Sequence, residues 1–149
     1  MVQVLVDIAV IGMGAVTLVS QVVARIFEVI LGRQPKAPEQ LPEIVGGVEI
    51  TLAVIAVTIV APLAEETFFR GFLYQALRKW KGVAWGAAIS ALFFALAHFS
   101  PIILPGLFAL GFIFAHVFER QDSLGASIVG HATYNLIVVV LLLSGVVET

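Results

Sequence analysis

The sequence contains 149 residues, of which 60% are hydrophobic and only 12% are charged. Soluble domains are usually about 45–50% apolar and about 25% charged, so both departures indicate an integral membrane protein. The net charge of −2 is too small to indicate a nucleic-acid partner, and the lack of cysteine excludes disulfides, thiolate metal sites and a cysteine nucleophile.

The first apolar run, Val2 to about Val23, is long enough to cross a bilayer, whose core requires roughly 20 helical residues. It lacks a basic start and a small-residue cleavage site, so we interpret it as a retained membrane helix rather than a signal peptide. A polar, proline-containing linker follows over 33–43. We therefore predict that residues 1–44 form an N-terminal transmembrane helix and linker, followed by a second unit over 45–149.

The second unit contains four further apolar runs. The first begins near Val45 and stays apolar up to the basic stretch "RKWKG", which is too long for one perpendicular span at about 1.5 Å per residue. We expect this helix to tilt, to kink near Pro62 or to extend into water. The other predicted spans are Val83 to Phe99, Ile102 to Phe118 and Ala126 to Val147. The predicted fold is an all-α, polytopic transmembrane helix bundle of about five spans.

Polar residues inside these runs are informative because ionisable groups in a membrane are costly and are usually functional or paired. They are Asp7, Glu65, Glu66, Arg70, His98, His116, His131 and Asn135. Glu66 and Arg70 are four residues apart on one helix, so they can form an ion pair. Glu65 points about 100° away from Glu66 around that helix and has no equally good local partner. Asp7 has no visible partner, and we assign it no role.

Four of these groups are predicted to lie at a similar depth, measured along the helices from the side that carries "RKWKG". At about 1.5 Å per residue, the estimates are about 22 Å for Glu65 and His98, 14 Å for His131 and 20 Å for Asn135. Independent structural residues on three different spans would have no reason to agree in depth. We therefore expect these four side chains to lie close together.

A carboxylate, two imidazoles and an amide in a dry cavity allow three kinds of function. A carboxylate with one histidine can activate water, while the other histidine and the asparagine donate to an oxyanion, which suits amide hydrolysis. Two histidines and one glutamate also match a ligand set of catalytic zinc, although the usual HExxH helix is absent. Carboxylate and histidine chains can also form a proton or ion path.

Three short motifs resemble those of one known family. "EETFFR" (65–70) resembles the EExxxR motif of the CAAX prenyl endopeptidase family, the type II CAAX proteases, and of its bacteriocin-processing and self-immunity relatives, called CPBP or Abi proteins. "FALAH" (94–98) resembles the FxxxH motif and "HATYN" (131–135) the HxxxN motif. Residues 112–116 also fit FxxxH, but His116 is only about 6 Å from the basic side of the membrane and too close to the third motif. The resemblance covers roughly 45–147.

The resemblance implies an intramembrane endopeptidase in a multi-pass integral membrane protein, located in the cell membrane if the organism is prokaryotic. It implies that Glu65 acts with His98 to activate water, and that His131 and Asn135 form the oxyanion site. Supporting residues carried over from the motifs are Glu66, Arg70 and Phe94. Because asparagine is a poor zinc ligand but a good oxyanion donor, we favour a mechanism without an obligatory metal. The alternative is zinc bound by Glu65, His98 and His131.

The implied partners are the lipid bilayer and a peptide or protein substrate, including one that is C-terminally prenylated; no nucleic acid is expected. The alternative function is a non-enzymatic membrane immunity or binding protein, or a proton path. An excess of basic residues favours the side that carries Arg78, Lys79, Lys81 and Arg120 as cytoplasmic. Family members commonly carry more spans than are predicted here, which fits either a minimal member or a fragment.

Overall fold

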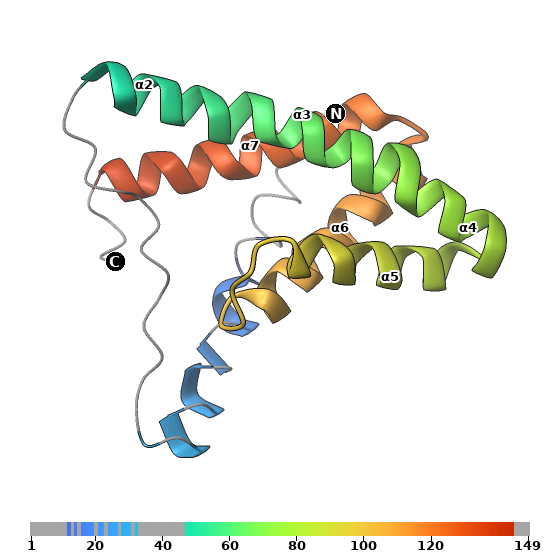
Figure 1. Ribbon diagram of the computed structural model, residues 1–149, viewed down its shortest axis with the longest axis horizontal. Coiled ribbons are helices and arrows are strands. Elements are labelled where there is room, and N and C mark those ends of the chain that lie inside the picture. The colour runs from blue at the N-terminus through green and yellow to red at the C-terminus, as the bar shows by residue number, and fades with distance from the viewer. Residues whose placement is uncertain are drawn as a thin grey trace.

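The computed structural model describes residues 47–144 without a gap, together with positions 12, 14, 16–19, 21–22, 24–26, 28–30 and 32. This described part is helical and contains no strand (Figure 1). Much of the first predicted span, including Asp7, and the polar linker lie outside the described residues, so the boundary between the two predicted units stays a prediction.

One continuous helix of 35 residues runs from Gly47 to Lys81. It consists of α2 (Gly47–Ile55), the π-helical segment η1 (Ala56–Val60), α3 (Ala61–Glu66), the π-helical segment η2 (Thr67–Tyr74) and α4 (Gln75–Lys81). At about 1.5 Å per residue the helix is roughly 52 Å long, well beyond the bilayer core of about 30 Å. The irregularity expected near Pro62 takes the form of wider π-helical turns on both sides of α3, and the chain stays helical throughout.

Glycines allow the next helix to fold back closely. Helix α4 ends at Lys81 and is followed by Gly82, whose φ of 85° lies in a region that favours glycine. Helix α5 (Val83–Leu96) then packs against α4, and a Cβ added at Gly86 would lie only 2.9 Å from the backbone nitrogen of Arg78. Helix α5 ends at Leu96, before the predicted limit at Phe99, so His98 lies in a turn rather than on the helix.

Two longer helices complete the bundle, α6 (Leu104–Gln121) and α7 (Leu124–Leu143). Asp122 adopts a left-handed conformation with φ of 45° after α6, and the Ser123 hydroxyl accepts a hydrogen bond from the Ala126 N–H at the start of α7. Helix α7 packs against α6 and also lies alongside α3 and η1 (Figure 1). The helix that carries "EETFFR" and the helix that carries "HATYN" are therefore neighbours.

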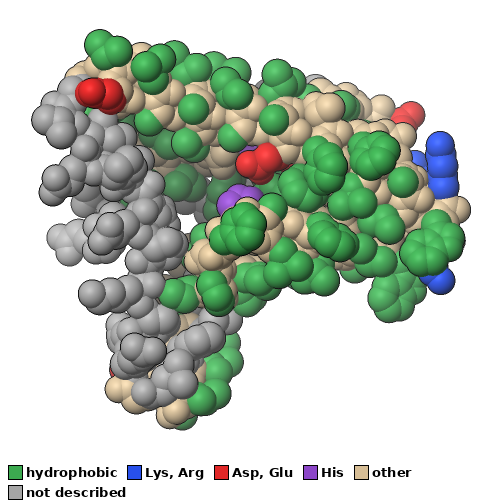
Figure 2. Space-filling model, in the orientation of Figure 1, with side chains coloured by type: hydrophobic (Ala, Val, Ile, Leu, Met, Phe, Trp, Pro, Cys, Tyr) green, Lys and Arg blue, Asp and Glu red, His purple; other side chains and the backbone are tan. Residues whose placement is uncertain are grey.

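The basic ends of α4 and α6 meet at one end of the bundle. Arg78 Nη2 lies 2.9 Å from Glu119 Oε1, and the Tyr74 hydroxyl donates to Glu119 Oε2 at 2.7 Å. Figure 2 shows the blue lysine and arginine side chains of the visible face at this end. The basic ends of α4 and α6 are thus on the same side of the bundle, as the depth estimate assumed. Which side is cytoplasmic stays a prediction.

The surface and the core both fit a membrane bundle. The main core cluster is Phe69, Phe94, Leu110, Phe114, Val117, Ala126 and Tyr134. Large hydrophobic side chains also cover the visible outer face (Figure 2), which is costly in water over such an area. Phe72, for example, is 65% exposed and Leu52 is 61% exposed. In the described part, Gly47–Lys81 and α7 are long and apolar enough to cross a bilayer, and α5 is a shorter apolar helix. The fold is the expected all-α membrane helix bundle, while the number of spans stays a prediction.

Candidate active site

The predicted ion pair between Glu66 and Arg70 is confirmed. Arg70 Nη1 lies 2.8 Å from Glu66 Oε1, and both side chains are fully buried. Arg70 Nη2 donates to the Gly111 carbonyl on α6 at 2.7 Å. Its guanidinium carbon also lies 4.7 Å from the ring centre of Phe94 and 5.3 Å from that of Phe114, within the range of cation–π attraction. Arg70 therefore joins the first motif to both α5 and α6.

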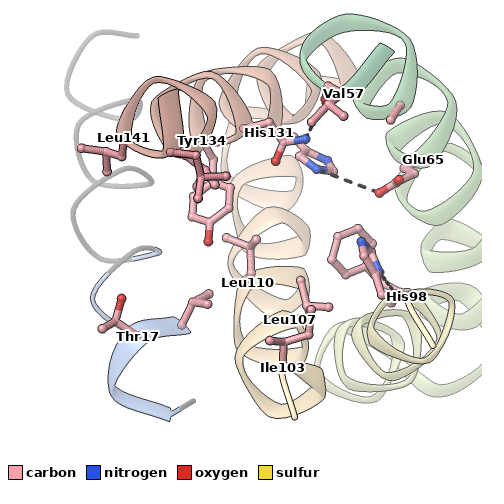
Figure 3. Close-up of a pocket in the computed structure, with 16 residues that line it drawn as sticks. Thr17, Val57, Glu65, His98, Ile103, Leu107, Leu110, His131, Tyr134 and Leu141 are labelled. Atoms are coloured by element: carbon pink, nitrogen blue, oxygen red, sulfur yellow. Dashed lines mark hydrogen bonds and ion pairs between the residues drawn. The ribbon is translucent and has the colours of Figure 1, made fainter. Parts of the chain in front are cut away.

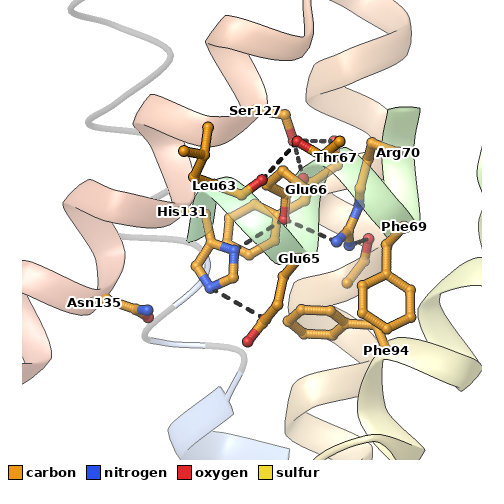
Figure 4. A network of polar contacts seen from close by, with 12 residues as sticks. Leu63, Glu65, Glu66, Thr67, Phe69, Arg70, Phe94, Ser127, His131 and Asn135 are labelled. Carbon is orange, nitrogen blue, oxygen red and sulfur yellow. Dashed lines mark hydrogen bonds and ion pairs between the residues drawn. The ribbon is translucent and has the colours of Figure 1, made fainter. Parts of the chain in front are cut away.

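Glu66 has more partners than the local spacing predicted. Its Oε2 accepts a hydrogen bond from Ser127 Oγ, and its Oε1 lies 2.9 Å from His131 Nδ1, both on α7 (Figure 4). Since a carboxylate only accepts, Nδ1 of His131 carries the proton of this bond. Glu66 thus determines which His131 nitrogen is directed at the rest of the site, because Nε2 is then the nitrogen left for other partners.

Of the two adjacent glutamates, Glu65 is the one with an unsatisfied carboxylate oxygen. Its Oε2 lies 3.9 Å from His131 Nε2 (Figure 4), and among the described residues it is one of two buried side-chain polar atoms without a hydrogen-bond partner, the other being Arg70 Nε. The Glu65 side chain remains 30% exposed. Glu65 therefore has one unbonded oxygen near His131 and a partly exposed side chain. Both oxygens of Glu66, in contrast, accept hydrogen bonds, and its side chain is fully buried.

His98 lies in the turn that follows α5, and its ring is held by its own chain. Nδ1 lies 2.9 Å from the Phe94 carbonyl oxygen, an acceptor, so Nδ1 donates and Nε2 is the accepting nitrogen of a neutral ring. The Phe94 ring lies between the two histidines, with ring centres 4.9 Å from His98 and 5.7 Å from His131. Phe94 is fully buried, which explains why this motif needs a large apolar residue four positions before the histidine.

Asn135 is directed at the helix opposite. Its Nδ2 donates to the Val57 carbonyl oxygen in η1 at 2.9 Å. The amide nitrogen carries two hydrogens, so this bond leaves one donor for another group. Asn135 is one turn beyond His131 on α7, so both side chains lie on the same helical face, as the spacing predicted.

One cavity of about 740 Å³ joins the four predicted residues. Glu65, His98, His131 and Asn135 all line it, and Figure 3 shows Glu65 and His98 reaching into it from different segments of the bundle. The expectation that these side chains lie together is confirmed. The remaining lining is mostly apolar and comes largely from α6 and α7: Ile103, Leu107, Leu110, Tyr134, Val138, Leu141 and Leu142. His116, the competing match to the second motif, is exposed on α6 and does not line the cavity.

The described side chains do not form a metal centre as they stand. Within the part of the chain that the structure describes, no group of three or more histidine, aspartate and glutamate side chains is placed to hold a metal ion. The 3.9 Å from His131 Nε2 to Glu65 Oε2 is longer than the roughly 3.4 Å expected between two ligands that each lie about 2.1 Å from one tetrahedral zinc. The bond from His131 Nδ1 to Glu66 is itself compatible with a histidine that ligates a metal through Nε2.

Ser127 is the site residue that sequence reasoning missed. It is fully buried, bonded to Glu66 Oε2 and 3.4 Å from the Phe114 carbonyl. The available signal was its position four residues before His131, which places both on one face of α7. A buried serine inside an apolar span is common, however, and its partner is far away in the sequence.

Comparisons with known proteins agree with the motifs. Residues 47–137 match the family described as type II CAAX prenyl endopeptidase Rce1-like. The membrane-embedded CAAX protease MroQ of Staphylococcus aureus (strain USA300) is 30% identical over 138 residues, which cover 89% of this chain and 56% of the relative. The putative membrane peptidase YdiL of Bacillus subtilis (strain 168) is 28% identical over 116 residues, covering 78% and 47%.

A further relative is the UPF0177 protein YxdF of Lactococcus lactis subsp. lactis (strain IL1403), 33% identical over 98 residues, which cover 64% of this chain and 53% of the relative. The chain thus spans about half the length of the curated relatives it matches. No solved structure matches the chain. The matched region, 47–137, contains all three motifs and every residue of the polar network described above.

Proposed function

Because the chain belongs to the Rce1-like family of type II CAAX prenyl endopeptidases, we propose that it is an intramembrane endopeptidase that hydrolyses a peptide bond with activated water. The observation that carries this proposal is the Glu65 carboxylate, whose Oε2 has no hydrogen-bond partner among the described residues and which faces a cavity shared with His98, His131 and Asn135. An unpaired carboxylate beside an imidazole is the arrangement that general-base catalysis requires.

Glu65 and His98 activate the water in this mechanism. Glu65 accepts a proton from water, and the water oxygen forms a bond to the carbonyl carbon of the peptide. His98 accepts a hydrogen bond from the same water through Nε2, because Nδ1 is held by the Phe94 carbonyl. When the carbon–nitrogen bond breaks, the proton held by Glu65 passes to the leaving nitrogen, so that Glu65 ends the reaction ionised again.

His131 and Asn135 stabilise the oxyanion that forms when water adds to the carbonyl. The second amide hydrogen of Asn135 supplies one donor, and Nε2 of His131 supplies another when the ring is doubly protonated, since Nδ1 already carries the proton donated to Glu66. Glu66 supports this role because its bond to Nδ1 directs Nε2 towards Glu65 and the cavity. Donors that are already oriented cost no reorganisation during the reaction, which is the usual origin of oxyanion stabilisation.

The proposed substrate is a peptide or protein with a strongly apolar segment near the cleaved bond. The cavity is lined mostly by leucine, isoleucine and valine, with Tyr134, and such a wall favours apolar groups over charged ones. The relative MroQ is named as a CAAX protease. A C-terminally prenylated peptide is therefore the first substrate to test, with the same peptide lacking the lipid as the comparison.

The experiment measures cleavage of an internally quenched peptide, with and without a C-terminal prenyl group, by the full chain in proteoliposomes. His98→Ala and His131→Ala should each lower the rate by at least about 10²-fold, the low end of general acid–base effects. His116→Ala is the matched control, since this exposed histidine does not line the cavity, and it should cleave at the wild-type rate. Equal rates for all four proteins would contradict the proposal.

A non-enzymatic membrane protein is the competing interpretation, and it required no convergence of the three motifs. Glu65 lies 3.9 Å from His131 and shares a cavity with His98, so the arrangement does not favour it. The experiment above decides between the two interpretations. The non-enzymatic interpretation is supported if folded wild-type protein cleaves neither peptide at any substrate concentration that can be tested in the vesicles.

A further inference from the structure

Pro62 interrupts the hydrogen bonding of the site helix at one defined point. It is fully buried in α3, inside the 35-residue helix. Just before it, the Ala61 N–H donates to the carbonyl of Ala56, five residues back, which sets a π-helical register. In that register the Val57 carbonyl would accept from the N–H of residue 62. A proline has no N–H, so the helix itself leaves the Val57 carbonyl without this donor.

Asn135 takes the place of the missing donor. Its Nδ2 lies 2.9 Å from the Val57 carbonyl oxygen, across 78 positions of sequence. The carbonyl only accepts, so the side-chain nitrogen rather than the side-chain oxygen must face η1. This contact therefore fixes the amide orientation of Asn135. The remaining amide hydrogen is then available to a group in the cavity that Asn135 lines.

We propose that Pro62 is a positioning residue: by withholding a backbone N–H, it keeps the Val57 carbonyl free to orient the Asn135 amide as an oxyanion donor. Pro62 acts through Asn135 and does not touch the substrate. The inference rests on the proposed function only in naming an oxyanion as the group that Asn135 binds. The contact between Val57 and Asn135 does not depend on that function. The role of the proline is to lack the backbone N–H that would compete with Asn135 for the Val57 carbonyl, and not to kink the helix.

The perturbation is Pro62→Ala, which restores an N–H where the Val57 carbonyl can accept it. Alanine is the best helix former, so the variant is expected to keep the helix and to release Asn135. The matched control is Pro105→Ala in the first turn of α6. The first N–H groups of a helix have no intrahelical acceptor, so a new N–H at residue 105 displaces no partner.

The first readout is independent of catalysis. Asn135 is the only asparagine in the chain, so asparagine labelled with ¹⁵N at Nδ2, introduced by cell-free synthesis, gives a single side-chain amide nitrogen in NMR, with a separate signal for each of its two hydrogens. We expect exchange of the bonded hydrogen with solvent to be about tenfold faster in Pro62→Ala, the factor for loss of an ordinary hydrogen bond. Unchanged exchange in Pro62→Ala, or an equal change in Pro105→Ala, would overturn the inference.

The second readout is the peptide-cleavage rate. Asn135→Ala removes the donor and should lower kcat by about 10²–10³-fold, whereas Pro62→Ala should lower kcat by about tenfold and leave KM within about twofold. Because Pro62 acts through Asn135, the double variant should be no slower than Asn135→Ala alone. A further loss in the double variant would refute the positioning role. Wild-type cleavage by Asn135→Ala would instead refute the proposed oxyanion site, and the exchange measurement would still decide the contact.

Discussion

Replacing Arg70 with methionine tests whether the buried polar network holds the three motifs together. The substitution keeps side-chain length but removes the cation 2.8 Å from Glu66 and the donor 2.7 Å from the Gly111 carbonyl. Removing one partner of a buried ion pair typically costs about 3–5 kcal/mol, because the other charge stays buried without compensation. For a chain of this size, each kcal/mol lowers the melting temperature by about 2–4 °C. We therefore expect a loss of roughly 6–20 °C.

The assay is thermal unfolding in detergent micelles followed by tryptophan fluorescence. Arg25→Met is the matched control, since Arg25 is 78% exposed and pairs with Glu28 at 3.1 Å on its own helix. Exposed pairs contribute about 0–1 kcal/mol, so this variant should melt within about 4 °C of the wild type. Combining Arg70→Met with Glu66→Gln should cost less than the sum of the single changes, because no uncompensated charge remains. The reasoning fails if Arg70→Met melts within about 2 °C of the wild type.

Two further predictions rest on single contacts, and a third rests on the proposed mechanism. Ser127→Ala leaves Glu66 Oε2 without its donor, so it should destabilise the protein by about 1–3 kcal/mol and also slow cleavage. The control is Ser90→Ala, which removes a bond to the Phe69 carbonyl only and should change stability without a comparable effect on cleavage. Gly111→Val should lower the melting temperature because a Cβ there lies 3.1 Å from the Ala91 Cα, whereas Gly14→Ala meets nothing within 4 Å and should melt like the wild type. Cleavage should survive thorough chelation in protein shown to lack zinc; loss of activity that only zinc restores would establish the zinc mechanism instead.

Much of the architecture could be predicted because it depends on local patterns. Long apolar runs separated by charged or proline-containing stretches predict membrane helices, and the i, i+4 spacing predicted the Glu66–Arg70 pair that the structure contains. The depth estimate placed Glu65, His98, His131 and Asn135 together, as the shared cavity confirms. It succeeded because helical rise per residue is nearly constant, so distance along the chain converts to depth.

The remaining parts of the site depend on contacts between distant segments. The bonds of Glu66 to Ser127 and His131 span 61 and 65 positions, and local spacing cannot show which face of α7 meets α3. The sequence therefore presented Glu66 as paired with Arg70 alone, whereas it also orients His131. The π-helical turns were missed because Pro62 signals an irregularity in the helix but does not specify the form that it takes.

The central claim is that the Glu65 carboxylate accepts a proton from the attacking water, and one substitution tests this role most directly. Glu65→Gln keeps the size of the side chain and removes its capacity to accept a proton, so folded variant protein in proteoliposomes should cleave the quenched peptide at least about 10²-fold more slowly than wild type. Glu49→Gln, an exposed glutamate at the start of α2, should cleave at the wild-type rate. Wild-type cleavage by Glu65→Gln would contradict the account, because no other described carboxylate in the cavity could replace it.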